Sequence, residues 1–393
     1  MMTDGKKFGF GCMRLPLLKK EDQASFDFKK IEGLFDRFLE KGFTYFDTAY
    51  TYHNHQAEAA VRKALVERHP RESYELATKL PLRDFKNEAD LSRIFQGQLS
   101  SCGVDYFDYY LIHNMGSNVY AKSERYHVFD FVKAQKDAGL IKYIGMSFHD
   151  QPELLDTVLA KYGKIIDFVQ LQINYIDWED PTIQSRNCLA ISRKHHKPVV
   201  VMEPCKGGTL VNIPEAAQQR MQAYAPEASI ASWALRFAAG QEGVIRVLSG
   251  MNSMEQVEEN TETFLDFKPL NLEEQKIVQE VVEMIRQNTA IACTACGYCT
   301  SGCPQNIMIP SYFVLYNSLK RTTGSSSSQV LYYHNTSIAA GSKPGDCIAC
   351  GQCEKSCPQH LPIRQYLKEV AQKFESSDLF PKMPSQLKRG TSQ

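Results

Sequence analysis

Residues 1–270 alternate apolar strand-like runs with amphipathic helical stretches, and this alternation limits the fold more than any other feature. Eight strand candidates follow one another: FGFGCM (8–13), FTYFDT (43–48), YELATK (74–79), YFDYYLIH (106–113), YIGMSF (143–148), FVQLQI (168–173), PVVVME (198–203) and GVIRVLS (243–249). Strands joined by helical crossovers form a parallel sheet, and eight such units close economically into a (β/α)8 TIM barrel. An open doubly wound sheet is the alternative, although no GxGxxG follows the first strand.

Two copies of one cysteine pattern, C-x2-C-x2-C-x3-C-P, lie beyond the predicted barrel. The first reads CTACGYCTSGCPQ (293–305) and the second CIACGQCEKSCPQ (347–359). In proteins with two [4Fe–4S] clusters, three cysteines of such a run hold one cluster and the fourth holds the other. We therefore predict two ligand sets, Cys293, Cys296, Cys299 with Cys357, and Cys347, Cys350, Cys353 with Cys303. Zinc is the alternative, but zinc sites usually combine two CxxC pairs.

The length of 393 residues predicts more than one domain. We expect a barrel over residues 1–270 and a dicluster domain over residues 271–375 that opens with a linking helix capped by Asn271. Helical stretches follow both cysteine motifs, which favours a small, mainly helical, two-cluster ferredoxin-like domain. Residues 376–393 are expected to form a flexible tail.

Composition excludes several classes of protein. Lys and Arg together number 45 and equal the Asp and Glu total, so no bulk charge favours nucleic acid or an anionic membrane. Neither a signal-peptide core nor an apolar run of about 18 residues is present, which predicts a cytoplasmic protein. Eight of the twelve cysteines lie within residues 293–357, and such crowding in a reducing compartment indicates metal binding.

Four polar residues at or just beyond the carboxyl ends of three consecutive predicted strands form a candidate proton-donor site. They are Asp47, Tyr52, Lys79 and His113. Each alone has a structural interpretation, such as a helix cap or a buried histidine. Together they suit carbonyl reduction, because a lysine ammonium lowers the pKa of a nearby tyrosine, a carboxylate holds the ammonium, and an imidazole orients the substrate oxygen.

The segments GFGCMRLP, FDTAYTYHNHQAE, LATKL, YLIHN and IGMSFH resemble the aldo/keto reductase family, over roughly residues 5–265. The resemblance implies that Asp47, Tyr52, Lys79 and His113 are the catalytic tetrad. The cysteine region resembles a 4Fe–4S dicluster module. The whole chain is thus similar to the ferredoxin-linked branch of the family.

The resemblance also implies a nicotinamide cofactor, NADP or NAD. Ser147 and Gln170 match the residues that hold the nicotinamide amide, and Asn260 matches the residue beside the adenine. Gly250 and Gln256 stand where the family has a lysine and an arginine that bind the 2′-phosphate. Loss of two cations removes charge-assisted hydrogen bonds worth about 1.5–3 kcal/mol each, so the choice between NADPH and NADH stays open.

The favoured hypothesis is an oxidoreductase that reduces a small-molecule carbonyl substrate with a nicotinamide and exchanges electrons through its two [4Fe–4S] clusters. A ferredoxin or another electron-transfer protein is the expected partner, and neither nucleic acid nor a membrane is expected. One alternative is a simple aldehyde or ketone reductase whose clusters are structural. A second is a non-catalytic redox or iron sensor built on a retired barrel.

Overall fold

The structure is a computed structural model that describes residues 6–19, 22–180, 183–287, 290–291, 293, 295, 297–320, 327–357 and 360–376. The chain divides into two compact units, Met1–Ile285 and Arg286–Gln393. Each unit is described by itself below.

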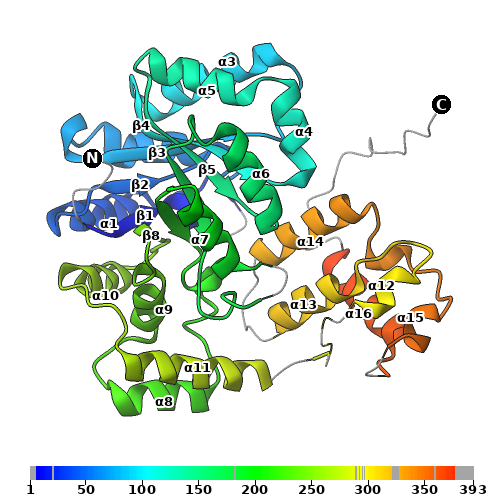
Figure 1. Ribbon diagram of the computed structural model, residues 1–393. Coiled ribbons are helices and arrows are strands. Elements are labelled where there is room, and N and C mark those ends of the chain that lie inside the picture. Colours follow the sequence, from blue (N-terminus) through cyan, green and yellow to red (C-terminus); the bar gives the residue numbers. More distant parts are fainter. Residues whose placement is uncertain are drawn as a thin grey trace. The chain divides into compact units, whose positions relative to one another are not determined.

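The first unit is a closed barrel of eight parallel strands in the order β1-β2-β3-β4-β5-β6-β7-β8 (Figure 1). The strands are β1 Phe8–Gly11, β2 Tyr45–Asp47, β3 Glu75–Pro81, β4 Phe107–Met115, β5 Ile141–Phe148, β6 Phe168–Gln172, β7 Val199–Met202 and β8 Val244–Ser249. All eight coincide with the predicted runs to within a few residues. The predicted (β/α)8 barrel is therefore confirmed, and the open sheet is excluded.

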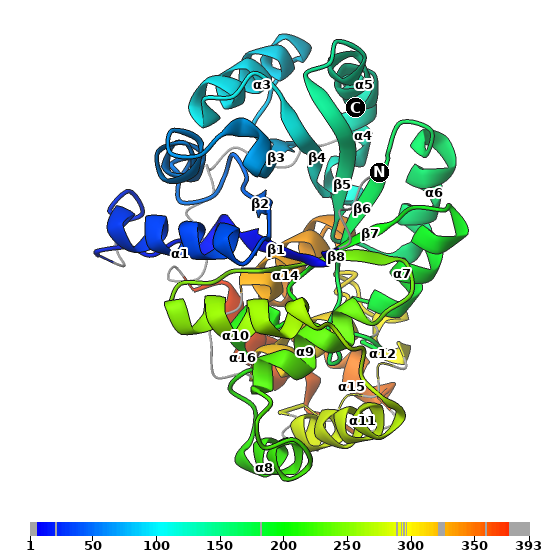
Figure 2. The same ribbon diagram turned by 90° about the vertical axis from the view of Figure 1, so that its left-hand side faces the viewer.

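Helices follow the strands and lie outside them (Figure 2). They are α1 Phe28–Glu40, α2 Ala57–Val61, α3 Glu88–Cys102, α4 Ser117–Arg125, α5 Val128–Asp137, α6 Pro152–Tyr162, α7 Ser185–Lys194, α8 Glu215–Tyr224, α9 Ile230–Ala239, α10 Met254–Leu265 and α11 Leu272–Gln287. Helix α1 shows why these segments fold as they do, because its apolar residues recur on one face and Asp27 accepts a hydrogen bond from the backbone N–H of Lys30.

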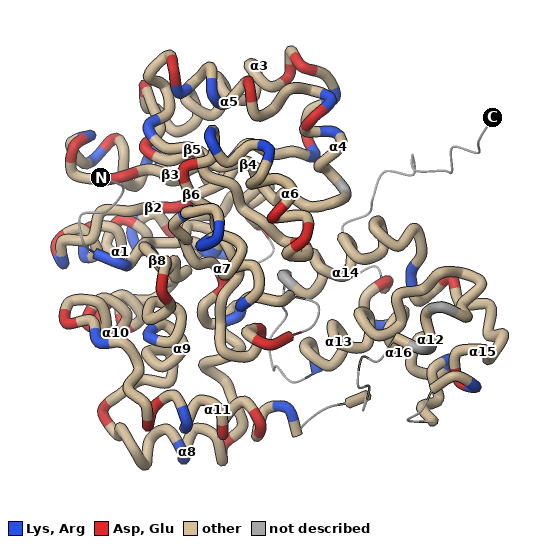
Figure 3. The backbone as a smooth tube through the Cα atoms, viewed as in Figure 1, with Lys and Arg blue, Asp and Glu red and all other residues tan. Residues whose placement is uncertain are grey.

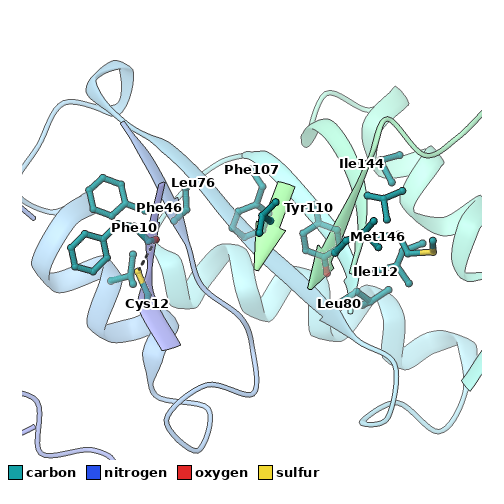
Figure 4. Packing of buried hydrophobic residues seen from close by; sticks show 14 of the residues in the cluster. Phe10, Cys12, Phe46, Leu76, Leu80, Phe107, Tyr110, Ile112, Ile144 and Met146 are labelled. Carbon is teal, nitrogen blue, oxygen red and sulfur yellow. Dashed lines mark hydrogen bonds between the residues drawn. The ribbon is translucent and has the colours of Figure 1, made fainter. Parts of the chain in front are cut away.

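Each strand has one row of side chains inside the barrel and another facing the helices, because side chains alternate along a strand. On β4, Tyr109 and Leu111 belong to the interior cluster. Tyr110 and Ile112 belong to the larger cluster between strands and helices (Figure 4). The interior is tightly filled: a Cβ at Gly145 would lie 2.3 Å from the Phe168 ring, so only glycine fits there.

Helix α11 packs its apolar face against the barrel unit. Asn271 and Glu274 form a capping box, with hydrogen bonds of 2.9 Å and 2.8 Å between each side chain and the other's backbone N–H. The Glu274 carboxylate also pairs with Arg236 of α9 at 2.7 Å. The predicted cap is present, but the units divide after Ile285 and not at the expected residue 270, because these contacts tie α11 to the barrel.

The second unit is helical, as predicted. Its described helices are α12 Tyr298–Ser301, α13 Ile309–Lys320, α14 Ser327–Ala340, α15 Gln352–Lys355 and α16 Ile363–Phe374. Aromatic rings join the longer helices: Phe313 of α13 contacts Tyr366 of α16 edge-on, and Tyr333 of α14 stacks on Phe374 at 4.5 Å between centroids. The predicted tail lies, apart from Ser376, outside the described residues.

No helix among the described residues is long and apolar enough to cross a membrane.

Candidate functional site

The pleat of the strands places three of the four predicted tetrad residues on the interior row near the carboxyl ends of β2, β3 and β4. Asp47 is two residues after the interior Tyr45, Lys79 two after Ala77, and His113 two after Leu111. A spacing of two keeps a side chain on the same face of a strand. All three are almost fully buried, whereas Tyr52 lies half-buried in the turn after β2.

The Lys79 ammonium joins the tetrad together. It donates hydrogen bonds to the Asp47 carboxylate, to the Thr48 carbonyl oxygen at 2.8 Å and to the Tyr52 hydroxyl oxygen at 3.2 Å. An ammonium has three N–H groups, so these bonds use all of them. Because Tyr52 accepts from Lys79, its own O–H is left to donate to another group.

Burial sets the charge states of this site. Burial lowers the pKa of Lys79, but the Asp47 carboxylate and Tyr52 together raise it more, so the net shift is upward. Burial raises the pKa of Tyr52, and Lys79 opposes that rise. The ammonium therefore acts in the predicted direction, but the pKa of Tyr52 is not lowered overall. The phenol is neutral at physiological pH and carries its proton.

His113 faces Tyr52 edge-on, with 6.1 Å between the ring centroids. Burial lowers the pKa of His113 well below its usual value, and the positive charge of Lys79 adds to this shift. The imidazole is therefore neutral near pH 7. A neutral imidazole has one N–H donor and one nitrogen acceptor, so it can donate to a carbonyl oxygen.

A second buried network lies on the helix side of β3 and fixes the backbone at Lys79. Glu58 of α2 accepts hydrogen bonds of 2.6 Å from the Thr78 hydroxyl and from the Gln98 amide of α3. The same amide donates to the Lys79 carbonyl oxygen at 3.1 Å, and Tyr110 donates to the other end of Gln98 at 2.6 Å. Helices α2 and α3 thus hold the strand that carries Lys79.

Glu58 predicts a pH dependence of stability. Burial raises the pKa of Glu58 to about 7, above its ordinary value of 4.5. The folded protein therefore keeps a proton that the unfolded chain has lost, and stability falls as the pH rises from 4.5 to about 7. In the parent, this should lower the free energy of unfolding by on the order of 3 kcal/mol across that range. Glu58→Gln has no titrating group at this position, so its free energy of unfolding should not show that fall.

Chemical unfolding followed by tryptophan fluorescence measures this, because both tryptophans, Trp178 and Trp233, lie in the barrel unit. The exposed Glu153 of α6 offers a matched control, and Glu153→Gln should keep the parental pH slope. An unchanged slope in Glu58→Gln would show that Glu58 is not the group responsible.

The residues predicted to bind the nicotinamide cofactor, Ser147 and Gln170 at its amide and Asn260 beside its adenine, lie on or next to the carboxyl ends of β5, β6 and β8. Ser147 on β5 accepts a hydrogen bond from the Asn114 backbone N–H at 2.8 Å and still has its hydroxyl hydrogen to donate. Gln170 on β6 donates to Asp47 at 3.2 Å, which connects it to the tetrad. Asn260 of α10 is buried and donates to Ser249 at 3.3 Å. The hydroxyl of Ser147 and the amide of Gln170 are groups that can hydrogen-bond the amide of a nicotinamide.

The segment expected to bind a cofactor phosphate, 249–260, contains neither lysine nor arginine. Gln256 instead accepts a hydrogen bond from the Asn252 backbone N–H at 2.7 Å. A cation comes from the loop after β1: a Cβ placed on Gly250 would lie 3.8 Å from the Arg14 guanidinium. Arg14 also pairs with Glu203, beyond β7, at 3.4 Å.

Cysteines from both motifs line one small cavity in the second unit. Its lining includes Cys303 from the first motif and Cys347, Cys350 and Cys353 from the second. These are the four residues predicted to hold one cluster. Among the described residues, no three His, Cys, Asp or Glu side chains come close enough together to hold a single ion. Four thiols spread around a cavity fit a cubane, in which each iron takes one thiolate.

The described parts of the two motif loops share two features. In both, the third residue donates a backbone N–H to the first cysteine sulfur at 3.4 Å, from Ala295 to Cys293 and from Ala349 to Cys347. Both alanines have φ of 56°. Such N–H···S bonds stabilise a thiolate ligand and tune an iron–sulfur cluster.

The other predicted ligand set is described in part. Cys299 and Cys357 are buried and Cys293 is half-buried, and helices α12 and α15 of the two motifs contact each other. Cys296 lies outside the described residues. All eight ligand assignments, like the tetrad and nicotinamide contacts, stay predictions.

Comparison with known proteins decides the family. Residues 7–283 match the model of the aldo/keto reductase family. The chain belongs to this family. Residues 292–362 match the model of the 4Fe-4S dicluster domain. The resemblance stated from the sequence is thereby confirmed for both parts of this aldo/keto reductase.

Relatives of this aldo/keto reductase align with its barrel. "Uncharacterized oxidoreductase YqkF" of Bacillus subtilis is 24% identical over 308 residues, which are 70% of this chain and 92% of the relative. The aldo-keto reductase AKR11C1 from Bacillus halodurans has a TM-score of 0.56 at 24% identity, over 70% of this chain and 91% of that one. An aldo-keto reductase from Klebsiella pneumoniae in complex with NADPH has a TM-score of 0.56 at 20% identity, over 70% of this chain and 90% of that one.

Sequence reasoning missed three residues of this aldo/keto reductase that the structure places beside the predicted sites. Glu58 lies in an apolar helical run, and a carboxylate there is a signal for a buried hydrogen-bonded network. Arg14 follows the first strand by three residues, and its guanidinium lies beside Gly250, directly after β8. Arg364 lines the cysteine cavity, although only its position seven residues after Cys357 could have pointed to it.

Proposed function

We propose that this chain reduces the carbonyl group of a small molecule with a nicotinamide cofactor, and that its C-terminal unit exchanges single electrons through two [4Fe–4S] clusters. The observation that carries the first part is the Lys79 ammonium, buried between the Asp47 carboxylate and the Tyr52 hydroxyl oxygen. This arrangement leaves the Tyr52 proton available at the carboxyl ends of the strands, where barrel enzymes carry out catalysis.

When bound, the nicotinamide supplies the hydride that adds to the carbonyl carbon. The protein supplies the proton: the Tyr52 O–H bond breaks and a new O–H bond forms on the carbonyl oxygen, which gives the alcohol. The resulting phenolate is stabilised by the Lys79 N–H that already points at the Tyr52 oxygen. Neutral His113, edge-on to Tyr52, positions the carbonyl oxygen. Asp47 keeps Lys79 in place and charged.

The phosphate groups of the cofactor find few cations in this chain. We propose that Arg14 provides the positive charge that segment 249–260 lacks, because its guanidinium lies against Gly250. One arginine shared with Glu203 is a weaker anchor for a 2′-phosphate than two free cations. Both NADPH and NADH are therefore proposed as cofactors.

The role of the clusters follows from their surroundings. Cys350 and the neighbouring Ile348 are exposed, so the cavity lies near the surface of its unit. A cluster near the surface can exchange electrons with a second protein. We propose a ferredoxin-type carrier, or another one-electron protein, as that partner. Two clusters together hold two electrons, one each, which is the number in one hydride.

The test starts from protein purified without air and assayed for iron and sulfide. NADPH and NADH are each offered with a panel of aldehydes and ketones, and alcohol and oxidised nicotinamide are both measured. Equal amounts of the two products are expected, at rates well above those of Tyr52→Phe. If no pair of cofactor and carbonyl gives alcohol above that background, the reductase proposal is wrong and a retired barrel is favoured.

A second arm tests the clusters. They are reduced with dithionite, excess reductant is removed, and a one-electron acceptor is added while visible absorbance is recorded. Rapid and complete reoxidation is expected. Clusters that are not reoxidised would favour a purely structural role. Addition of a carbonyl together with oxidised nicotinamide then shows whether electrons pass between the clusters and the barrel.

A further inference from the structure

Arg364 brings a positive charge to the cysteine cavity of the second unit. It follows Ile363 at the start of α16 and lines the cavity with Cys303, Cys347, Cys350 and Cys353. Among the described residues of this unit, no other charged side chain lines the cavity. Figure 3 shows how few charged residues this unit carries compared with the barrel unit.

The guanidinium is held in a fixed place. Glu354, directly after Cys353, accepts hydrogen bonds from the Arg364 side chain at 3.0 Å and from its backbone N–H at 2.9 Å. A second side-chain contact between the two measures 2.8 Å. The Arg364 side chain lines the cavity, whereas Glu354 does not. A carboxylate that grips the guanidinium at two points also fixes its orientation.

The motif loop leaves room for this cation. Gly351 has φ of 75°, and a Cβ placed there would lie 3.7–3.8 Å from the Arg364 guanidinium. The guanidinium therefore lies against the turn that connects Cys350 to Cys353. The positive charge of Arg364 thus lies close to the cysteines that are predicted to bind the cluster.

The first motif has no counterpart of this pair. A shift of 54 positions superimposes Cys293 on Cys347 and each later cysteine on its equivalent. It places Thr300 at the position of Glu354 and Pro310 at the position of Arg364. The described residues of the two loops share the N–H···S bond and the φ of the alanine that donates it. The first motif, however, lacks the charged pair of the second.

We infer that Arg364 raises the reduction potential of the cluster held by Cys303, Cys347, Cys350 and Cys353 above that of the other cluster, so that the first electron to enter the unit resides there. Reduction adds one negative charge to a cluster, and a fixed cation stabilises the reduced form more than the oxidised form. The inference rests on the proposed function, which supplies the two clusters. Half of the Arg364 side chain is exposed, so solvent weakens the effect but does not reverse its sign.

The experiment is a redox titration of the full-length protein, purified without air and followed by electron paramagnetic resonance. The parent should show two one-electron steps at different potentials. Arg364→Gln should move the higher step downward and leave the lower step unchanged. At a fixed potential within the higher step, the ratio of reduced to oxidised cluster should fall about threefold or more. Arg364→Lys keeps the charge and should retain most of the parental value.

Lys368→Gln is the matched control, because Lys368 is exposed one turn further along α16 and does not line the cavity. It removes the same charge and should move neither step. Equal shifts in Lys368→Gln and Arg364→Gln, or a shift of the lower step alone, would overturn the inference. Parent protein with too little iron and sulfide for two clusters would instead contradict the two-cluster assignment on which it rests.

Discussion

Replacement of Tyr52 by phenylalanine is expected to lower kcat for carbonyl reduction by about 10²–10⁴-fold, the usual contribution of a positioned general acid. Phenylalanine keeps the ring that faces His113 and removes the oxygen that accepts from Lys79. The hydride acceptor then has no proton donor of its own, while the packing around the turn is kept. Steady-state kinetics with the best carbonyl substrate measure the change.

Tyr50→Phe is the control for this prediction. Tyr50 lies in the same turn, is also half-buried and contacts the His55 ring at 4.7 Å between centroids. Its hydroxyl makes none of the hydrogen bonds that join Lys79 to the tetrad, so it should be dispensable and kcat should stay within about twofold of the parent. Equal losses in both variants would mean that the turn, and not the Tyr52 proton, is what catalysis requires. An unaffected Tyr52→Phe enzyme would contradict the proposed mechanism outright.

Much of the tetrad geometry was predictable, because in a closed barrel the position of a residue along its strand determines whether its side chain faces the interior. Asp47, Lys79 and His113 share the parity of the interior residues on their strands, and the carboxyl ends of neighbouring strands converge. The pKa of Tyr52 was less predictable, because it depends on how deeply the ring is buried as well as on Lys79. Burial depth is a property of the folded chain, and spacing along the sequence does not contain it.

The division of the chain shows the same limit. The helix after residue 270, its cap and its apolar face were all readable from the sequence. The sequence did not show which unit this apolar face would cover. Ile277 and Val281 pack in one cluster with residues far away along the chain, such as Met221 and Trp233. Glu58 and Arg364 were missed for a related reason, since their hydrogen-bonding partners lie 10 to 40 residues away.

Cys303→Ala is expected to remove the cluster of the other motif. Cys303 belongs to the first motif by sequence, yet it lines the cavity of the second with Cys347, Cys350 and Cys353. Loss of one ligand should cost that cluster, so iron and sulfide should both fall by about half. Cys205→Ala, a change at a barrel cysteine outside both motifs, should retain the full amount.

Iron content alone does not say which of the two clusters is lost. The effect of Arg364→Gln on the reduction potential of the surviving cluster identifies it. If the second-motif cluster is gone from Cys303→Ala, then adding Arg364→Gln should leave the potential of the surviving cluster unchanged, because Arg364 lines the other cavity. If Cys303 instead served its own motif, the surviving cluster would be the one beside Arg364 and its potential would fall. The double variant therefore decides whether the two motifs exchange their fourth ligands, as the position of Cys303 in the cavity indicates.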